Sequence, residues 1–452
     1  MGALWTDLYE LNMAASYLRR GMAGPATFSL FVRHLPPERG YLVAAGLADA
    51  LRFIESYTFT ADDLAYLRDV HDFDESTLKA FAGLHFSGDV WAVPEGRIVF
   101  ADEPLLEVTA PIAEGQLLET YLLNQMTFQT TIASKAARCV VAAGGRDVVD
   151  FSFRRTQGPD AALSVARVSA IVGFAGTSNV EAARRFGLRA VGTMAHSYIQ
   201  AFPTEREAFR AFAEDFPEST TFLVDTFDTL DGVRSAIDVI RDLGLSAQLG
   251  IRLDSGDLSD LARESRGLLD GAGLTDARIV ASGGLDEYVI TRLLADGAPI
   301  DTFGVGTKMG VSADAPYLDS VYKLVAYGGR PVMKLSPAKV TAPGAKQVFR
   351  RVDGPFDDVI GLRDEPIAPE REPLLVPVMR DGRPVDEGDD LHSANERFRR
   401  DLLRLPGSAR RIERPVHPLV RRSRRLDDLI ARTERSVAPE NSHTDAGSLG
   451  GL

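Results

Sequence analysis

The chain has 452 residues, of which 45% are hydrophobic and 25% charged, and its formal net charge is −13. This composition is typical of a folded globular protein, and the length is enough for two or three domains. The negative balance argues against a general nucleic-acid-binding protein, although a local basic pocket can still hold a small anion. No apolar run reaches the ~18 residues of a membrane span, and the first residues lack the basic flank and apolar core of a signal peptide.

The chain contains a single cysteine, Cys139. One cysteine forms no intrachain disulfide, which fits a reducing compartment, so we expect a cytoplasmic protein. The neighbours of Cys139 are apolar, which favours a small buried side chain over a catalytic thiol.

The N-terminal part of the chain mixes helix and strand signals. Residues 6–21 predict a helix with Thr6 as its N-cap, residues 26–36 predict a strand, and residues 42–57 predict a second helix. Residues 88–111 contain short strands separated by turn residues. Together these segments predict a small α+β unit.

From about residue 117 to residue 323 the pattern becomes regular, with strands and helices alternating. A helix is predicted over 115–143. The predicted strands are 147–153, 189–193, 220–226, 247–253, 277–282 and 301–306, with helices at 179–187, 231–244, 258–273 and 286–297 between them. Apolar strands joined by crossover helices indicate a parallel sheet covered on its outer face. The number of units predicts a closed or nearly closed (β/α) barrel, and a doubly wound open sheet is the alternative.

After Tyr327 the alternation ends. Residues 392–406 predict a helix. The tail is small and polar without apolar anchors, and we expect it to be disordered.

Distinctive polar residues or glycines follow nearly every predicted strand. They are Arg154, His196, Asp225, the pair Arg252 and Asp254, the turn Ser282-Gly283-Gly284, and the turn Gly304 to Thr307. In a parallel barrel these loops meet on one face, and that face carries the chemistry. Taken alone, His196 is more readily explained as a hydrogen-bonded core histidine. Its position after a strand and its small neighbours single it out.

Two glycine-rich turns suggest a phosphate site. Ser282, Gly283 and Gly284 precede a predicted helix, and Gly304, Gly306 and Thr307 follow a predicted strand. Without a Cβ, backbone N–H groups can approach an anion closely, and such turns after the last barrel strands commonly cradle a phosphate. The alternative is that both are only tight turns.

Charged side chains beside these turns suggest what else is bound. Arg252 and Asp254 are two residues apart on an extended backbone, so they point the same way. They form either a structural ion pair or a site for a phosphorylated polyol. Arg154, near Phe151, offers a planar guanidinium for a carboxylate beside an aromatic ring that can stack on a flat base.

In this order, the motifs resemble those of the nicotinate phosphoribosyltransferase family. They are "TDLYELNMA", "DFSFRRTQGPDA", "GFAGTSNV", "GTMAHSYI", "LVDTFDT", "IRLDSGDL", "ASGGLDE", "FGVGTKMG" and "KLSPAKVTAPGAKQVFRR". The resemblance covers most of the chain and fades after about Arg351. It implies a type II phosphoribosyltransferase with a barrel over residues 126–330. The second, α+β domain would be built from residues 1–125 and 331–435, leaving 436–452 as a tail.

The resemblance also implies a reaction. Nicotinate and 5-phosphoribosyl-1-pyrophosphate (PRPP) would give nicotinate mononucleotide and pyrophosphate, with Mg²⁺ present and ATP hydrolysis coupled through phosphorylation of His196. The implied base site has Arg154 on the carboxylate, Phe151 stacked on the ring and Asp225 near the ring nitrogen. Tyr9 would reach the site of a neighbouring subunit, which implies a head-to-tail homodimer.

The remaining implied roles concern the phosphoribosyl group. Arg252 and Asp254 would hold the group and its ribose hydroxyls. The 5-phosphate would be held by Ser282, Gly283, Gly284, Gly304, Gly306 and Thr307.

Ser178 discriminates between nicotinate and nicotinamide. Nicotinamide phosphoribosyltransferases resemble this chain but carry an aspartate at that position. An aspartate there would repel a carboxylate by about 4 kcal/mol at ~4 Å and an effective dielectric constant of ~20, whereas a serine can donate a hydrogen bond. Ser178 favours the acid, unless it only caps the following helix.

Three alternatives remain at this point. A phosphosugar-binding barrel without catalysis would have lost residues such as His196, Arg154 or Asp254, which are present. An aldolase-like barrel needs a lysine late on a strand, for which Lys308 is the only candidate. Quinolinate phosphoribosyltransferase needs a more basic pocket for its doubly acidic substrate.

Overall fold

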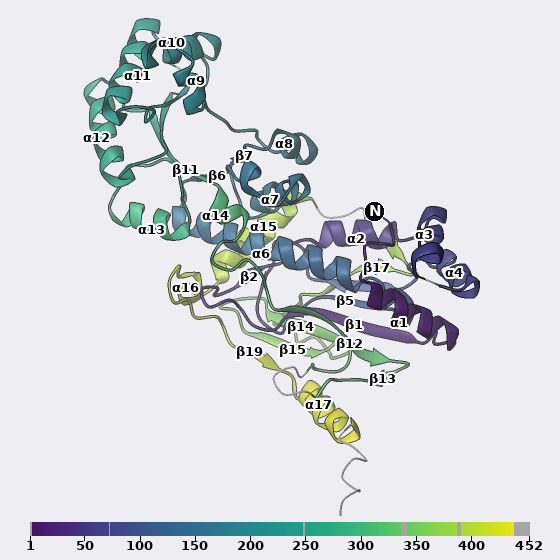
Figure 1. The fold of residues 1–452 in the computed structure, drawn as a ribbon. Coiled ribbons are helices and arrows are strands. Elements are labelled where there is room, and N and C mark those ends of the chain that lie inside the picture. The colour runs from purple at the N-terminus through teal and green to yellow at the C-terminus, as the bar shows by residue number, and fades with distance from the viewer. Residues whose placement is uncertain (1, 72, 247–248, 336–340, 387–389, 438–452) are drawn as a thin grey trace, which may run out of the picture.

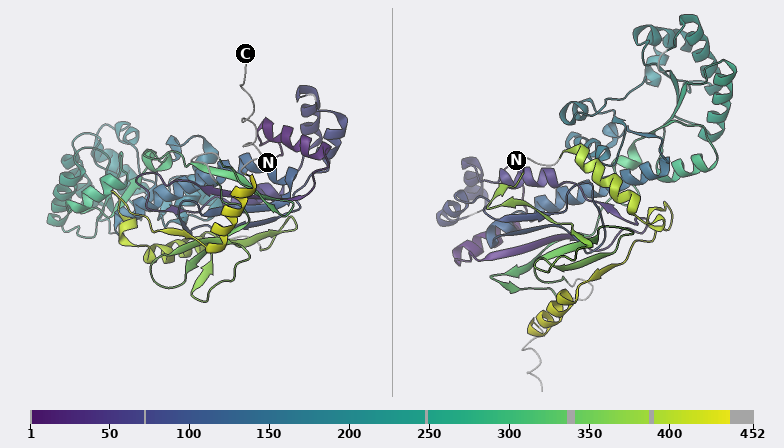
Figure 2. Two further views of the ribbon diagram at one scale, coloured as in Figure 1. Left: turned by 90° about the horizontal axis from the view of Figure 1, so that it is seen from below. Right: turned by 180° about the vertical axis from the view of Figure 1, so that it is seen from behind.

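A parallel sheet and an antiparallel sheet form the two halves of the computed structural model. It describes residues 2–71, 73–246, 249–335, 341–386 and 390–437. Helices α9 to α12 lie at one end and α3, α4 and α17 lie away from them (Figure 1), and this separation persists in the other views (Figure 2). Most of the tail 436–452, expected to be disordered, lies outside the described residues.

The antiparallel sheet has seven strands in the order β13-β12-β1-β5-β3-β17-β18. Its strands are β1 (Pro25–Val32), β3 (Asp89–Ala92), β5 (Pro104–Pro111), β12 (Ser320–Tyr327), β13 (Arg330–Pro331), β17 (Val376–Arg380) and β18 (Arg383–Pro384). β1 pairs with β5 on one side and with β12, almost 300 residues later, on the other. Strands from both ends of the chain therefore share one sheet.

Smaller sheets and helices complete this half. The four-stranded sheet contains β14 (Lys346–Arg351), β15 (Asp358–Leu362), β16 (Arg371–Pro373) and β19 (Val420–Arg422), and β2 (Leu42–Val43) pairs with β4 (Ile98–Val99). The helices are α1 (Leu8–Arg19), α2 (Leu47–Glu55), α3 (Ala61–His71), α4 (Glu75–Ala82), α5 (Ile112–Gln116), α15 (Leu391–Arg404), α16 (Gly407–Arg410) and α17 (Arg424–Val437).

The first predicted helix is present but begins differently. The N-cap is Asp7, not Thr6. The Thr6 hydroxyl instead contacts the buried Glu10 carboxylate, which also accepts the Thr120 hydroxyl at 2.6 Å. Thr6 therefore contributes to a link with the segment after α5.

The parallel sheet has six strands in the order β7-β6-β11-β10-β9-β8. They are β6 (Asp147–Asp150), β7 (Gly176–Thr177), β8 (Thr221–Leu223), β9 (Gly250–Leu253), β10 (Arg278–Ala281) and β11 (Thr302–Val305). Its helices are α7 (Pro159–Ile171), α8 (Val180–Phe186), α9 (His196–Gln200), α10 (Glu205–Asp215), α11 (Thr229–Leu243), α12 (Leu258–Gly271), α13 (Glu287–Ala295) and α14 (Thr307–Gly310). The expected strand–helix alternation and parallel sheet are confirmed.

The structure does not contain a closed barrel. Among the described residues, no pairing joins the β7 edge to β8, so the sheet is a half-barrel. The predicted strand at 189–193 is wrong, because only Ala190 forms a single bridge, to Thr177. The chain then enters α9 and α10 instead of adding a strand at this seam, and the two-residue strand β7 was not predicted.

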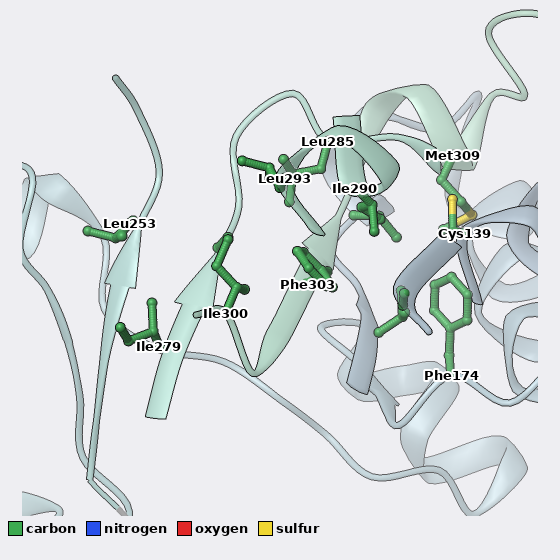
Figure 3. Packing of buried hydrophobic residues seen from close by; sticks show 14 of the residues in the cluster. Cys139, Phe174, Leu253, Ile279, Leu285, Ile290, Leu293, Ile300, Phe303 and Met309 are labelled. Atoms are coloured by element: carbon green, nitrogen blue, oxygen red, sulfur yellow. The ribbon is translucent and has the colours of Figure 1, made fainter. Parts of the chain in front are cut away.

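Apolar side chains fill the space between the parallel sheet and its helices. Leu253, Ile279 and Phe303 come from the neighbouring strands β9, β10 and β11 and share one buried cluster with Leu293 of α13 (Figure 3). Cys139 is fully buried in the same cluster, as expected, and burial raises the pKa of its thiol. No helix in the described part of the chain is both long and apolar enough to cross a membrane.

Helix α6 (Glu119–Ala143) connects the two halves (Figure 1). Near its C-terminal end two buried cations meet the buried carboxylate of Glu287, the first residue of α13. Lys135 Nζ lies 2.6 Å from Glu287 Oε2, and Arg138 Nε lies 2.8 Å from Oε1. Lys135 also pairs with Asp314, which Arg39 holds from the other side. This buried ionic cluster fixes the start of α13 to α6.

Candidate active site

Arg252, at the end of β9, contacts three polar side chains from neighbouring loops. Its Nη2 lies 2.5 Å from Asp254 Oδ1, its Nε donates to Ser282 Oγ at 2.7 Å, and its Nη1 donates to Thr193 Oγ1 at 3.1 Å. Arg252 and Asp254 thus point the same way, as the strand periodicity predicts. These contacts bring together the carboxyl ends of β9 and β10 and the loop that precedes α9.

The Asp254 carboxylate is held in its ionised form. Burial opposes ionisation, but the hydrogen bond from Ser282 and the charge of Arg252 outweigh it, so the pKa of Asp254 lies below its usual value. The Ser282 hydroxyl also donates to Asp254 Oδ1. The site therefore keeps a negative charge beside a guanidinium at neutral pH.

The dipeptide Asp225-Thr226, after β8, joins the Asp254 turn to His196. Asp225 Oδ2 accepts the backbone N–H of Asp254 at 3.0 Å and the Ser255 hydroxyl at 2.6 Å. Thr226 Oγ1 lies 3.1 Å from His196 Nδ1. His196 is the first residue of the short helix α9, so its ring is oriented by the strand end that also supports Asp254.

Two glycines of the predicted phosphate segments leave no room for a side chain: Gly283 in its turn, and Gly304, which lies within β11 and not in a turn. Gly283 has φ +86°, and a Cβ there would lie 1.8 Å from the backbone oxygen of Asp254. A Cβ on Gly304 would lie 2.6 Å from the Phe151 ring. The two segments are tied together because Lys308 Nζ lies 2.9 Å from Asp286 Oδ2, while Asp286 also caps α13.

Phe151 follows β6 and forms one wall of a cavity of about 210 Å³ inside the curved sheet. Its N–H donates to the Val305 backbone oxygen at 2.7 Å, and the Arg252 guanidinium lies 5.4 Å from its ring centroid. Gly192 and Thr193 line the same cavity. A flat aromatic ligand can stack on Phe151 here with a cation nearby.

Other predicted site residues lie outside this contact network. Arg154 is exposed in a single 3-10 turn (Phe153–Arg155), and no ion pair involves it among the described residues. Tyr9 lies on α1 in the antiparallel half and is 48% exposed. Gly284 and Thr307 are exposed, and Gly306 precedes α14. Residues 336–340 of the motif "KLSPAKVTAPGAKQVFRR" are outside the described residues.

Ser178 is half-buried, and its N–H donates to the Asp150 backbone oxygen at 2.8 Å. The alternative that it caps α8 is wrong, because the cap is Asn179, whose side chain accepts the Ala182 N–H at 3.1 Å. The Ser178 hydroxyl therefore has no role at that helix end.

Sequence reasoning gave no role to several residues that shape the site. Thr193, Thr226 and Ser255 each bond to a predicted site residue. All three lie within the motifs singled out in the sequence, so their closeness in sequence to predicted site residues could have indicated a role.

Comparison with known proteins identifies related sequences and folds. Residues 4–127 match the model of the nicotinate phosphoribosyltransferase N-terminal domain, and residues 147–351 match that of the nicotinate phosphoribosyltransferase family. The chain is 49% identical over 417 residues to nicotinate phosphoribosyltransferase pncB2 of Mycobacterium tuberculosis, covering 91% of this chain and 89% of that one. It is 44% identical to a Bacillus subtilis nicotinate phosphoribosyltransferase, covering 81% and 77%. The crystal structure of human nicotinic acid phosphoribosyltransferase superposes with a TM-score of 0.84 at 30% identity, covering 94% and 99%.

Proposed function

Because the chain belongs to the nicotinate phosphoribosyltransferase family, it is an enzyme of NAD salvage with that activity, and we propose that its reaction takes place around Arg252. The single observation that carries the assignment of the site is the contact set of Arg252 with Asp254, Ser282 and Thr193. It places a cation, an anion and two hydroxyls at the carboxyl ends of parallel strands, where ligands of such folds bind.

The phosphoribosyl group of PRPP fits this arrangement. Gly283, Gly284, Gly306 and Thr307 would present backbone N–H groups to the 5-phosphate. Among the described residues, the hydrogen bonds of the Asp254 side chain use Oδ1, so Oδ2 would accept a ribose hydroxyl. As the anomeric bond to pyrophosphate breaks, positive charge develops on the ribose, and an ionised Asp254 would stabilise it electrostatically.

Nicotinate would bind against Phe151. The cavity of about 210 Å³ beside this ring has room for a single aromatic ring. Arg154 would pair with the carboxylate as a planar fork, and the Ser178 hydroxyl would donate to it. Asp225 would lie near the ring nitrogen, which attacks the anomeric carbon once pyrophosphate leaves.

We assign His196 as the residue that ATP phosphorylates. With hydrogen on Nδ1 and Thr226 as its acceptor, Nε2 carries the lone pair. Nε2 would form a bond to the terminal phosphorus of ATP while the bond to ADP breaks. Hydrolysis of the phosphohistidine would release phosphate and draw synthesis forward.

Mg²⁺ fits the site as a companion of the substrate. No group of three or more His, Cys, Asp or Glu side chains in the described ranges is arranged to hold a metal. Mg²⁺ commonly keeps several waters and binds through substrate phosphates, so the pyrophosphate oxygens of PRPP would supply most of its ligands. When bound, it would neutralise charge on the leaving group.

The proposal includes a head-to-tail homodimer in which Tyr9 of one subunit reaches the other's site. Exposure of Tyr9 in the half of the molecule away from Arg252 supports this. It also includes a cytoplasmic location, which the buried free thiol of Cys139 supports.

A mononucleotide-formation assay tests the proposal. Purified protein is given PRPP and Mg²⁺ with nicotinate or nicotinamide, with and without ATP, beside His196→Ala. We expect product from nicotinate, an increase with ATP, and loss of that increase in the variant. Efficient product from nicotinamide would contradict the role of Ser178. Equal ATP stimulation in His196→Ala would contradict phosphorylation at this residue.

A further inference from the structure

The buried carboxylate of Asp150, the last residue of β6, accepts hydrogen bonds from two segments of the proposed nicotinate site. Its Oδ1 accepts the Ser152 N–H at 2.8 Å and the Ser152 hydroxyl at 2.5 Å, and its Oδ2 accepts the Thr177 hydroxyl at 2.7 Å. Asp150 is 1% exposed, and no ion pair involves it in the described ranges. A buried carboxylate without a cation needs such donors, so Asp150 and these two segments hold one another in place.

Asp150 lies behind the wall of the base cavity and not in it. Its neighbours in sequence, Val149 and Phe151, line the cavity of about 210 Å³. Because side chains alternate along a strand, Asp150 points to the opposite face of the sheet. Thr177 pairs with Asp150 across β6 and β7, which places both side chains on that face. Any effect of Asp150 on a bound base therefore passes through the residues that it holds.

The first of these segments carries Arg154. Ser152 precedes the 3-10 turn Phe153–Arg155, and its backbone oxygen accepts the Arg155 N–H at 2.8 Å. A Cβ on Gly310 would lie 2.5 Å from Ser152 Cβ, so Ser152 is packed tightly on its other side. By accepting both donors of Ser152, Asp150 fixes the start of the turn from which Arg154 extends.

The second segment carries Ser178. The Thr177 hydroxyl donates to Asp150 Oδ2 and accepts the Asn179 N–H at 3.0 Å. The Ser178 N–H donates to the backbone oxygen of Asp150 at 2.8 Å. Ser178 is therefore held to Asp150 through its own backbone and through both of its neighbours.

We propose that Asp150 is a positioning residue for nicotinate, which joins the turn of Arg154 to the turn of Ser178 so that both side chains meet the same carboxylate. This inference rests on the proposed function, which assigns Arg154 and Ser178 to the nicotinate carboxylate. The phosphoribosyl residues Arg252 and Asp254 lie on β9 and directly after it, and β11 and β10 separate β9 from β6. Loss of the Asp150 link therefore weakens the use of nicotinate more than the use of PRPP.

Thr177→Val tests this link with a small change of shape. Valine lacks the hydroxyl, so Asp150 Oδ2 loses its donor and the Asn179 N–H loses its acceptor. Buried groups left unpaired are destabilising, and we expect KM for nicotinate to rise about tenfold as the Ser178 turn shifts. Thr177→Ser keeps the hydroxyl and should bring this KM to within about threefold of wild type. KM for PRPP should stay within about twofold in both variants, because β7 lies on the side of β6 away from β11.

Two more variants complete the experiment. Ser152→Ala removes the other hydroxyl that donates to Asp150, and it should show the same difference between the two KM values. Thr220→Val is the matched control, because Thr220 is fully buried and its hydroxyl donates to the Phe216 backbone oxygen at 2.6 Å. Thr220 precedes β8 at the amino end of the sheet, so this variant should melt at a lower temperature with an unchanged KM for nicotinate.

Each protein is assayed without ATP, with PRPP and nicotinate saturating in turn, and its melting temperature is recorded. Wild-type KM for nicotinate in folded Thr177→Val and Ser152→Ala enzymes overturns the proposal, as does an equal rise of both KM values. A rise in Thr220→Val as large as that in Thr177→Val also overturns it, since general destabilisation would then explain the effect. If wild type forms no product from nicotinate, the proposed function fails and this inference fails with it.

Discussion

Replacing Gly304 with alanine separates base binding from phosphate binding. The added Cβ would lie 2.6 and 2.7 Å from two ring carbons of Phe151 and 3.3 Å from Ser282 Cβ. Non-bonded carbons prefer about 3.5–4.0 Å, so the ring must retreat by roughly 1 Å. Overpacking of this kind costs about 1–3 kcal/mol. If that cost falls on the stacking surface, KM for nicotinate rises about 5- to 150-fold.

The assay measures KM for nicotinate at saturating PRPP and KM for PRPP at saturating nicotinate. We expect the first to rise more than the second, since the clash is with Phe151 and not with the 5-phosphate. Gly267→Ala is the control, because Gly267 lies within α12 and a Cβ there meets nothing within 4 Å. A folded Gly304→Ala enzyme with unchanged KM for nicotinate would refute Phe151 as the stacking surface.

Further substitutions test the neighbouring groups. Gly283→Ala forces a Cβ against the Asp254 backbone oxygen in a left-handed conformation, so KM for PRPP should rise at least about tenfold, since 1.4 kcal/mol suffices. Ser178→Asp should weaken nicotinate use by about 2–4 kcal/mol and spare nicotinamide, as competing-base assays will show. Ser282→Ala removes a donor that lowers the pKa of Asp254; the acid limb of kcat/KM should therefore move to higher pH.

Each of these has an outcome that contradicts it. Gly283→Ala with wild-type kinetics would mean that its turn does not support the phosphoribosyl site. Equal loss of both bases in Ser178→Asp would indicate general damage, and a melting curve would reveal it. An unmoved acid limb in Ser282→Ala would remove Asp254 from the groups that govern activity on the acid side.

Features encoded within short segments were predictable. Apolar strands followed by amphipathic helices gave the parallel sheet, because both periodicities are local. The period of two along β9 placed Arg252 and Asp254 on the same side, and the ion pair follows. Polar residues at the strand ends predicted a cluster, and Arg252, Asp254 and Ser282 do lie together, because parallel strands bring their carboxyl ends to one edge.

Features that depend on distant partners were not predictable. Residues 189–193 have the composition of a strand. A strand also needs a neighbouring strand to pair with along its length, and here only Ala190 forms a bridge, to Thr177. The contacts of Asp225 with the Asp254 turn join two loops.

The ionic cluster at Glu287 limits how this enzyme can be divided. Its two closest cations, Lys135 and Arg138, lie on α6, upstream of the first strand of the parallel sheet. A chimaera that transplants only residues 147–310 would leave the Glu287 carboxylate buried and uncompensated, at about 3–5 kcal/mol. The half-barrel therefore cannot be moved into another protein as a unit without α6. Any successful transplant, circular permutation or split reporter built from this fold must carry α6 with it.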